Sequence, residues 1–122
     1  MNTTPSSNPN SNLRIWQQNM NKSRFAALTQ ANRPLHEEWD IICMQEQYMN
    51  SYDNIVANSR WRPVYPSRWS ENRRRSRSLI LVNTALDTNS WRPVEIPGTH
   101  DVTAIQLDTE AGKTTIFNIY ND

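Results

Sequence analysis

The chain has 122 residues, of which 36% are apolar, and thirteen basic side chains against twelve acidic ones leave a net charge of +1. This length allows one domain at most, and the apolar share is low against the roughly 45–50% of an ordinary soluble domain. No run approaches the ~18 apolar residues of a membrane-spanning helix, and the first residues lack the basic-then-apolar pattern of a secretory signal. The single cysteine, Cys43, excludes an internal disulfide framework and a cysteine-rich zinc site.

The first third of the chain predicts a tail followed by a strand and a helix. Residues 1–12 are Asn, Ser, Thr and Pro after Met1, a composition that buries too little surface to fold, so we expect a disordered tail. The imperfect apolar alternation over 13–18 predicts a strand that ends at Asn19. Ser23 is a candidate N-cap for a short helix, which Pro34 limits.

A second strand is predicted over 39–46. Its centre, Ile41 to Met44, is a continuous apolar run, which is typical of a strand buried on both faces. Cys43 belongs to this run, so we interpret it as an inert core thiol. The order strand, helix, strand within about thirty residues favours a crossover unit.

The second half predicts short strands separated by turns. The expected strands cover 61–65, 78–83, 102–108 and 114–120, with turn residues over 83–90 and at Pro93 and Pro97-Gly98. The last two strands flank the short loop 110–113, which indicates a hairpin. A crossover followed by hairpins favours a mixed sheet and the α+β class.

Arginine is concentrated in one segment. Seven of the eleven arginines lie between Arg60 and Arg77, interleaved with Trp61, Tyr65 and Trp69. Arginines with aromatic side chains suit a surface that follows phosphates and stacks on bases, and the alternative is a solvated loop. The candidate nucleic-acid-binding residues are Arg73, Arg74, Arg75 and Arg77. The same run also has the composition of a nuclear-import signal, so we expect an intracellular and potentially nuclear protein.

Three polar residues stand at predicted strand ends: Asn19, Glu46 and Tyr120. Loops at strand ends are where a sheet presents functional groups. Carboxylate and amide oxygens suit Mg²⁺, and a phenol could donate to a phosphate oxygen. Each residue also has a structural interpretation: Asn19 as a turn former, Glu46 as a solvated strand end, and Tyr120 as an aromatic residue at the edge of the core.

His100 and Asp101 have the composition of a catalytic pair. Because adjacent strand residues point to opposite faces, we interpret them instead as a turn before the strand that begins at Val102.

The order of these motifs resembles a known superfamily. The chain has Gln18-Asn19-Met20-Asn21, then Asp40-Ile41-Ile42-Cys43-Met44-Gln45-Glu46, then Ser78-Leu79-Ile80-Leu81-Val82-Asn83, then Phe117-Asn118-Ile119-Tyr120. This resembles the N-terminal half of the endonuclease/exonuclease/phosphatase superfamily, which has the DNase I-like fold. Within it, residues 13–122 are most similar to the apurinic-type endonuclease domain of fungal non-LTR retrotransposons.

The resemblance implies part of a four-layer α/β/β/α sandwich and a Mg²⁺-dependent attack of water on a DNA phosphodiester. By position, Glu46 would bind the metal, Asn19 would orient the site, and Tyr120 would contact the scissile phosphate. The family pattern continues after the Tyr with Asp-x-Asn and Ser-Asp-His motifs that place and activate the water, and neither follows Tyr120 in this sequence.

We therefore expect residues 13–122 to be a truncated endonuclease domain that is inactive as an isolated fragment. The first alternative is a catalytically dead remnant that binds DNA weakly through Arg60–Arg77, and the second is an unrelated small α+β binding domain. A partial sandwich would also leave the sheet face that meets the second sheet uncovered, which predicts self-association.

Overall fold

The structure, a computed structural model, describes residues 13–20, 35–46 and 59–121. In this part of the chain, seven strands form two β-sheets, and two single-turn 3-10 helices lie in the connections. In chain order the elements are β1 (Ile15–Asn19), η1 (Leu35–Glu37), β2 (Ile41–Gln45), β3 (Trp61–Val64), η2 (Arg73–Arg75), β4 (Ser78–Asn83), β5 (Trp91–Val94), β6 (Val102–Thr109) and β7 (Gly112–Ile119). The predicted tail over 1–12 and the predicted helix from Ser23 lie outside the described residues.

The first sheet is mixed, as the sequence predicts, and its strand order is β1-β2-β4-β3. β1 runs parallel to β2, while β4 is antiparallel to both of its neighbours. Every residue of the two central strands, β2 and β4, is buried. The apolar run from Ile41 to Met44 therefore fills both faces of the sheet, which confirms its interpretation as a strand buried on both sides.

The second sheet is antiparallel, with the order β5-β6-β7. The predicted hairpin joins β6 to β7, but its loop is shorter than expected, because Thr109 pairs with Gly112 and only two residues lie between them. Gly112 has φ of +110°, a backbone conformation that residues with a β-carbon rarely adopt.

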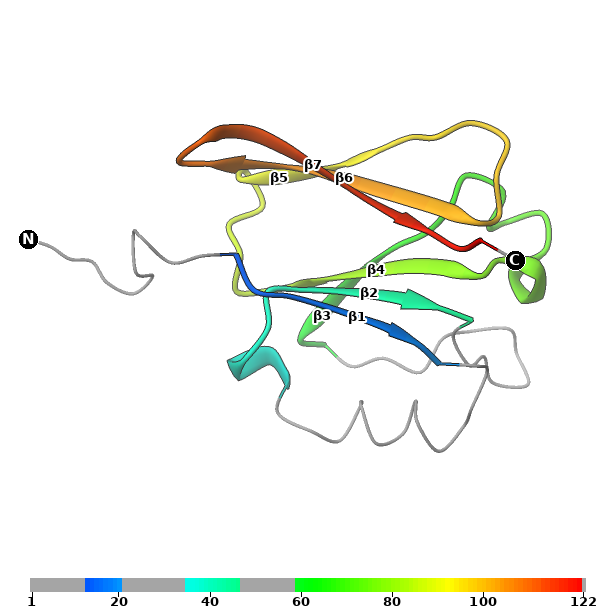
Figure 1. Ribbon diagram of the computed structural model, residues 1–122, viewed down its shortest axis with the longest axis horizontal. Helices are drawn as coiled ribbons and strands as arrows, with labels where there is room; N and C mark the ends of the chain where they lie inside the picture. Colours follow the sequence, from blue (N-terminus) through cyan, green and yellow to red (C-terminus); the bar gives the residue numbers. More distant parts are fainter. Residues whose placement is uncertain (1–12, 21–34, 47–58, 122) are drawn as a thin grey trace, which may run out of the picture.

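The two sheets pack face to face, as Figure 1 shows. Their interface contains a hydrophobic cluster that β2, β3 and β4 build from one side and β6 from the other: Ile41, Cys43, Val64, Ile80, Val82, Ile105 and Leu107. The expectation of an uncovered inner sheet face is therefore wrong. This one chain supplies both sheets, and each sheet covers the inner face of the other.

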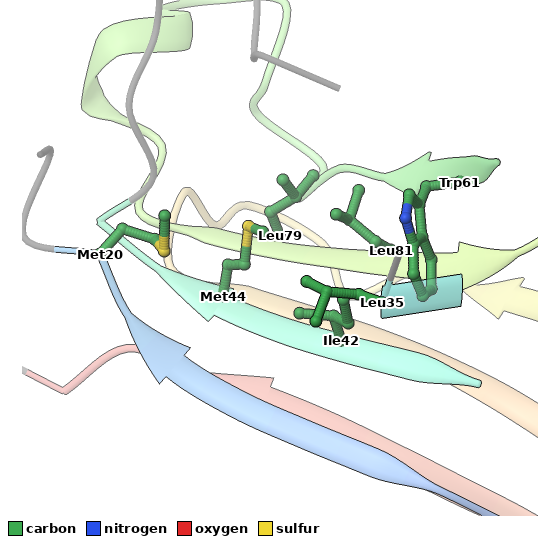
Figure 2. Close-up of a cluster of buried hydrophobic side chains, with 7 residues drawn as sticks. All are labelled: Met20, Leu35, Ile42, Met44, Trp61, Leu79 and Leu81. Carbon is green, nitrogen blue, oxygen red and sulfur yellow. The ribbon is translucent and has the colours of Figure 1, made fainter. Parts of the chain in front are cut away.

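A second cluster lies on the opposite face of the first sheet. Alternate residues of β2 and β4 point to this side, together with Trp61 from β3 and two residues from the connections. Figure 2 shows the cluster, which contains Met20, Leu35, Ile42, Met44, Trp61, Leu79 and Leu81. Trp16 and Trp39 pack against it with their rings 5.9 Å apart.

The sequence predicts a turn at Pro93, whereas the structure places this residue in strand β5. β3 and β5 have the same sequence, Trp-Arg-Pro-Val, and each forms an edge of its sheet. Proline is compatible with an edge strand because an edge leaves one row of backbone donors without a neighbour. The described residues form two β layers, so the α layers of the expected α+β class are not among the elements observed.

Candidate active site

The candidate residues lie at one end of the sandwich, because β1, β2 and β7 run toward that end and β4 begins there (Figure 1). Asn19 is the last residue of β1, Glu46 follows β2, and Tyr120 follows β7. The parallel register aligns Asn19 with Gln45, one residue before Glu46. Strand direction and register thus bring two of the three residues together.

Asn19 and Glu46 are in contact. The Asn19 side-chain amide donates to Glu46 Oε2 over 3.4 Å, and the backbone N–H of Met20 donates to the Gln45 carbonyl over 2.7 Å. Glu46 has φ of +52°, in the left-handed region that residues with a β-carbon occupy at a cost of about 1–2 kcal/mol. The chain therefore turns sharply where β2 ends, at the carboxylate.

Arg77 connects Tyr120 to the Glu46 turn. Its guanidinium carbon lies 4.6 Å from the centroid of the Tyr120 ring, and its Nε is 3.4 Å from an Asp101 carboxylate oxygen. The Arg77 carbonyl accepts from the Glu46 N–H over 3.0 Å, and the Tyr120 N–H donates to the Asp101 carbonyl over 2.8 Å. Tyr120 is thus fixed by its backbone and by a cation–π contact.

A buried polar network supports this end of the sandwich. The Asn118 amide donates to the carbonyls of Met44 and Leu79, each over 2.9 Å, and accepts from the Gln45 amide. Ser78 Oγ donates to the Asn118 carbonyl over 2.7 Å and contacts Thr103 Oγ1 over 2.8 Å. Hydrogen bonds of this kind offset the cost of burying polar groups between two sheets.

The sequence analysis did not identify this network. Gln45 and Asn118 belong to the Gln-Glu and Asn-Ile-Tyr motifs, so the sequence shows that they lie close to Glu46 and Tyr120 along the chain. It does not show that their side chains are buried. The available signal was an amide side chain one or two residues from a candidate site residue, on a strand with apolar neighbours.

The oxygen atoms at this end that could hold a metal ion include those of the Glu46 carboxylate and the Asn19 amide. In the described part of the chain, no three His, Cys, Asp or Glu side chains form a group that could enclose a metal. Mg²⁺ needs no such cage, since it commonly binds through one or two carboxylates and keeps several waters. Cys43 is buried away from solvent, and burial raises its pKa to about 11, in keeping with its interpretation as an inert core thiol.

The arginine-rich segment forms a turn and the short helix η2. The rings of Tyr65 and Trp69 stack with centroids 4.1 Å apart, and the Arg73 guanidinium lies 5.6 Å from the Trp69 centroid. Arg73 and Arg75 are exposed, Arg74 lies between them in η2, and Arg77 turns inward to Asp101 and Tyr120. Arg73 and Arg75 therefore face solvent, whereas Arg77 lies in the candidate site.

His100 and Asp101 lie in the turn before β6, as the sequence predicts. His100 Nδ1 is 2.9 Å from Ser76 Oγ, and the Asp101 carboxylate pairs with Arg77.

Comparison with known proteins supports the fold. No family model and no curated protein matches the sequence, and no helix in the described residues is long and apolar enough to cross a membrane. Among solved structures, the chain matches the endonuclease domain of TRAS1, a telomere-specific non-LTR retrotransposon, with a TM-score of 0.63 and 17% identity. The match covers 91% of this chain and 45% of that one, so this chain spans less than half of the solved domain. The chain therefore has part of a DNase I-like fold, the fold of the endonuclease domain of that non-LTR retrotransposon.

Proposed function

We propose that this chain is the N-terminal portion of a Mg²⁺-dependent DNA endonuclease of the retrotransposon type. The observation that carries the proposal is the contact between the Asn19 amide and the Glu46 carboxylate, at the end of a DNase I-like sandwich where β7 also delivers Tyr120. A carboxylate, an amide and a phenol beside a half-buried arginine suit a metal ion together with a phosphate.

In this proposal, Glu46 and the Asn19 amide oxygen would hold the metal, and water would complete its coordination. A bound Mg²⁺ supplies charge stabilisation for a phosphoryl oxygen. The Tyr120 hydroxyl would donate to another phosphate oxygen. Arg77 contacts the Tyr120 ring and would help to hold the phenol in place.

The part that holds metal and phosphate does not by itself activate water. Among the described residues, neither histidine is paired with an Asp in the manner of a general base: His100 contacts Ser76, and His36 lies 4.0 Å from exposed Glu37. A general base accelerates a reaction by a factor on the order of 10²–10⁴. We therefore propose that this chain alone binds metal and DNA but does not cleave DNA.

The test separates metal binding from cleavage. We expect Mn²⁺, used as a paramagnetic probe for Mg²⁺, to broaden amide NMR signals near Glu46 in the wild type and not in Glu46→Gln. Supercoiled plasmid with Mg²⁺ should show no nicking above a protein-free control. Broadening that persists in Glu46→Gln would disprove the metal site, and nicking that Glu46→Gln abolishes would disprove the proposed inactivity.

The second candidate function is a DNA-binding remnant without metal chemistry. The observation that favours it is the exposed Tyr65–Trp69–Arg73 stack, which joins aromatic rings to a guanidinium. Salt-dependent DNA binding that fails when Arg73, Arg74 and Arg75 are changed to Gln, combined with no Mn²⁺ effect at Glu46, would favour this function.

A protein that acts on chromosomal DNA also needs to reach the nucleus, and the run 72–77 is the candidate import signal.

A further inference from the structure

A basic pocket lies beside the candidate active site. It has a volume of about 300 Å³, and its lining combines the arginine-rich segment with the turn before β6: Arg68, Arg75, Gly98, Thr99, His100 and Asp101. Two arginines and a histidine supply its donors, and no hydrophobic side chain lines it. Such a lining suits a small anion and not an apolar ligand.

The walls of the pocket are held together by hydrogen bonds between segments about thirty residues apart. The Arg68 N–H donates to the Thr99 carbonyl over 3.0 Å, and the Thr99 N–H donates to Ser67 Oγ over 3.1 Å. Gly98 has φ of +68°, and a β-carbon at this position would lie 3.8 Å from the Arg68 guanidinium. The arginine therefore lies across the glycine turn, so the pocket is a built feature of the fold.

The carboxylates around the pocket pair with some of its arginines and not with all of them. Arg68 pairs with Glu71 over 3.0 Å, but both side chains are about half exposed, so this pair is weak. The Asp101 carboxylate is neutralised by Arg77. Arg75 is exposed and has no carboxylate partner among the residues that the structure describes. The pocket therefore has unpaired positive charge available to an anion.

The pocket is connected to the candidate active site through the backbone. Arg77 donates its N–H to the His100 carbonyl over 3.0 Å and accepts at its own carbonyl from Glu46. Asp101, the next residue in the lining, accepts from the Tyr120 N–H. An anion in the pocket would thus lie a few residues from the phenol and the carboxylate that the proposed function assigns to the scissile phosphate and the metal.

We propose that this pocket binds one phosphate of the DNA backbone adjacent to the scissile phosphate, with Arg68 and Arg75 contacting the same group. The proposal rests on the proposed function in taking DNA as the ligand. Two guanidinium groups and the His100 ring on one phosphate would fix the register of the strand, since phosphate contacts position a protein on nucleic acid.

The experiment measures the salt dependence of binding of the full chain to a short DNA duplex, in EDTA so that no metal contributes. One duplex phosphate contact contributes about 0.9 to the slope of log K against log salt concentration. We expect the double variant to reduce the slope by about 0.9, because it removes one phosphate contact, and each single variant to reduce it by less, because the other arginine still contacts that phosphate. The matched control is Arg92→Gln, which removes an equally exposed charge that instead contacts Gln106 on the second sheet and should leave the slope unchanged.

Inorganic phosphate, titrated by amide NMR, distinguishes DNA phosphate from a free anion. We expect shifts at Thr99 and His100 in the wild type and none in the double variant. A slope reduced by about 1.8 in the double variant would mean that the two arginines contact separate phosphates and would overturn the proposal, as would a double variant that behaves like Arg92→Gln. Phosphate shifts without any change in the DNA slope would show a free-anion site and also overturn it. Failure of the metal site at Glu46 would leave all of these results unaffected.

Discussion

Glu46 combines a functional group with an unfavourable backbone conformation. The residue carries the carboxylate that contacts Asn19, and its φ of +52° places the chain in the left-handed region at the end of β2. Residues with a β-carbon persist in such conformations when the surrounding structure fixes them, and they are concentrated at functional sites. The backbone bonds of its neighbours, from Met20 to Gln45 and from Glu46 to Arg77, supply that constraint.

Two substitutions at Glu46 separate strain from charge. Glu46→Ala and Glu46→Gly both remove the carboxylate, but only glycine adopts positive φ without steric cost. We predict that Glu46→Gly is more stable than Glu46→Ala by about 1 kcal/mol, measured by urea unfolding. Equal stabilities, or a less stable glycine variant, would show that this turn stores no strain.

Cys43 gives a pH-dependent stability with a definite sign. Burial raises the pKa of its thiol from 9.0 to about 11, so the native state keeps the proton at pH values where the unfolded state loses it. Stability is therefore full below pH 9 and falls as the pH rises toward 11, by about 1.4 kcal/mol per pH unit. Urea unfolding at several pH values should show this slope in the wild type. Cys43→Ala should lack this component, and identical slopes in both proteins would contradict the prediction.

At the scale of the elements, the ends of β2, β4 and β7 are joined by side chains as well as by packing. Asn118 of β7 bonds to the backbone of Met44 in β2 and of Leu79 in β4, and it is only 3% exposed. One amide thus crosses the interface between the sheets, directly below the residues of the candidate active site.

Removing this amide should loosen the site end of the sandwich. Asn118→Ala leaves the Gln45 amide and the carbonyls without this partner, and we predict a loss of about 3 kcal/mol in the free energy of unfolding. Asn118→Asp should be at least as harmful, because a carboxylate cannot donate to the carbonyls. Thr115→Ala, on an exposed position of the same strand, is the control and should change stability by less than about 0.5 kcal/mol. A similar loss of stability in Asn118→Ala and in Thr115→Ala would show that this network does not stabilise the fold.

Strands with a clear apolar pattern could be predicted from the sequence, and strands without one could not. β2 and β4 each contain a run of four apolar residues, so both strands could be predicted, and burial on both faces was predicted for Ile41 to Met44. β5 was missed because Pro93 suggests a turn, and only the neighbouring β6 shows that the residue sits on an edge. The contact of Asn19 with Glu46 could be predicted from motif order, whereas the pairing of Arg77 with Asp101 and Tyr120 depends on tertiary structure that no local pattern encodes.

At the scale of the whole molecule, the two most exposed large apolar side chains of the described residues lie on the outer face of the second sheet. Phe117 and Ile119 alternate with the inward-facing Ile116 and Asn118, so they point away from the first sheet. They are 54% and 58% exposed, and register places them beside Ala104 and Val102 of β6. The self-association expected for an inner face is therefore assigned to the outer face of the second sheet.

Replacing these two residues tests that assignment. We predict that the wild type associates with increasing concentration in light scattering, and that the double variant Phe117→Thr, Ile119→Thr remains monomeric, because threonine suits a strand without an apolar surface. The melting temperature should change little, since both side chains are more than half exposed. A wild type that is monodisperse at high concentration would contradict this prediction.

The prolines of the two Trp-Arg-Pro-Val strands disfavour the addition of a further strand at one edge of each sheet. β3 closes one edge of the first sheet and β5 one edge of the second, and each has a proline whose nitrogen offers no hydrogen to an incoming strand. The opposite edges, β1 and β7, have no proline. Any polypeptide that extends either sheet by backbone pairing should therefore add at β1 or β7. β1 ends at Asn19, and β7 ends one residue before Tyr120.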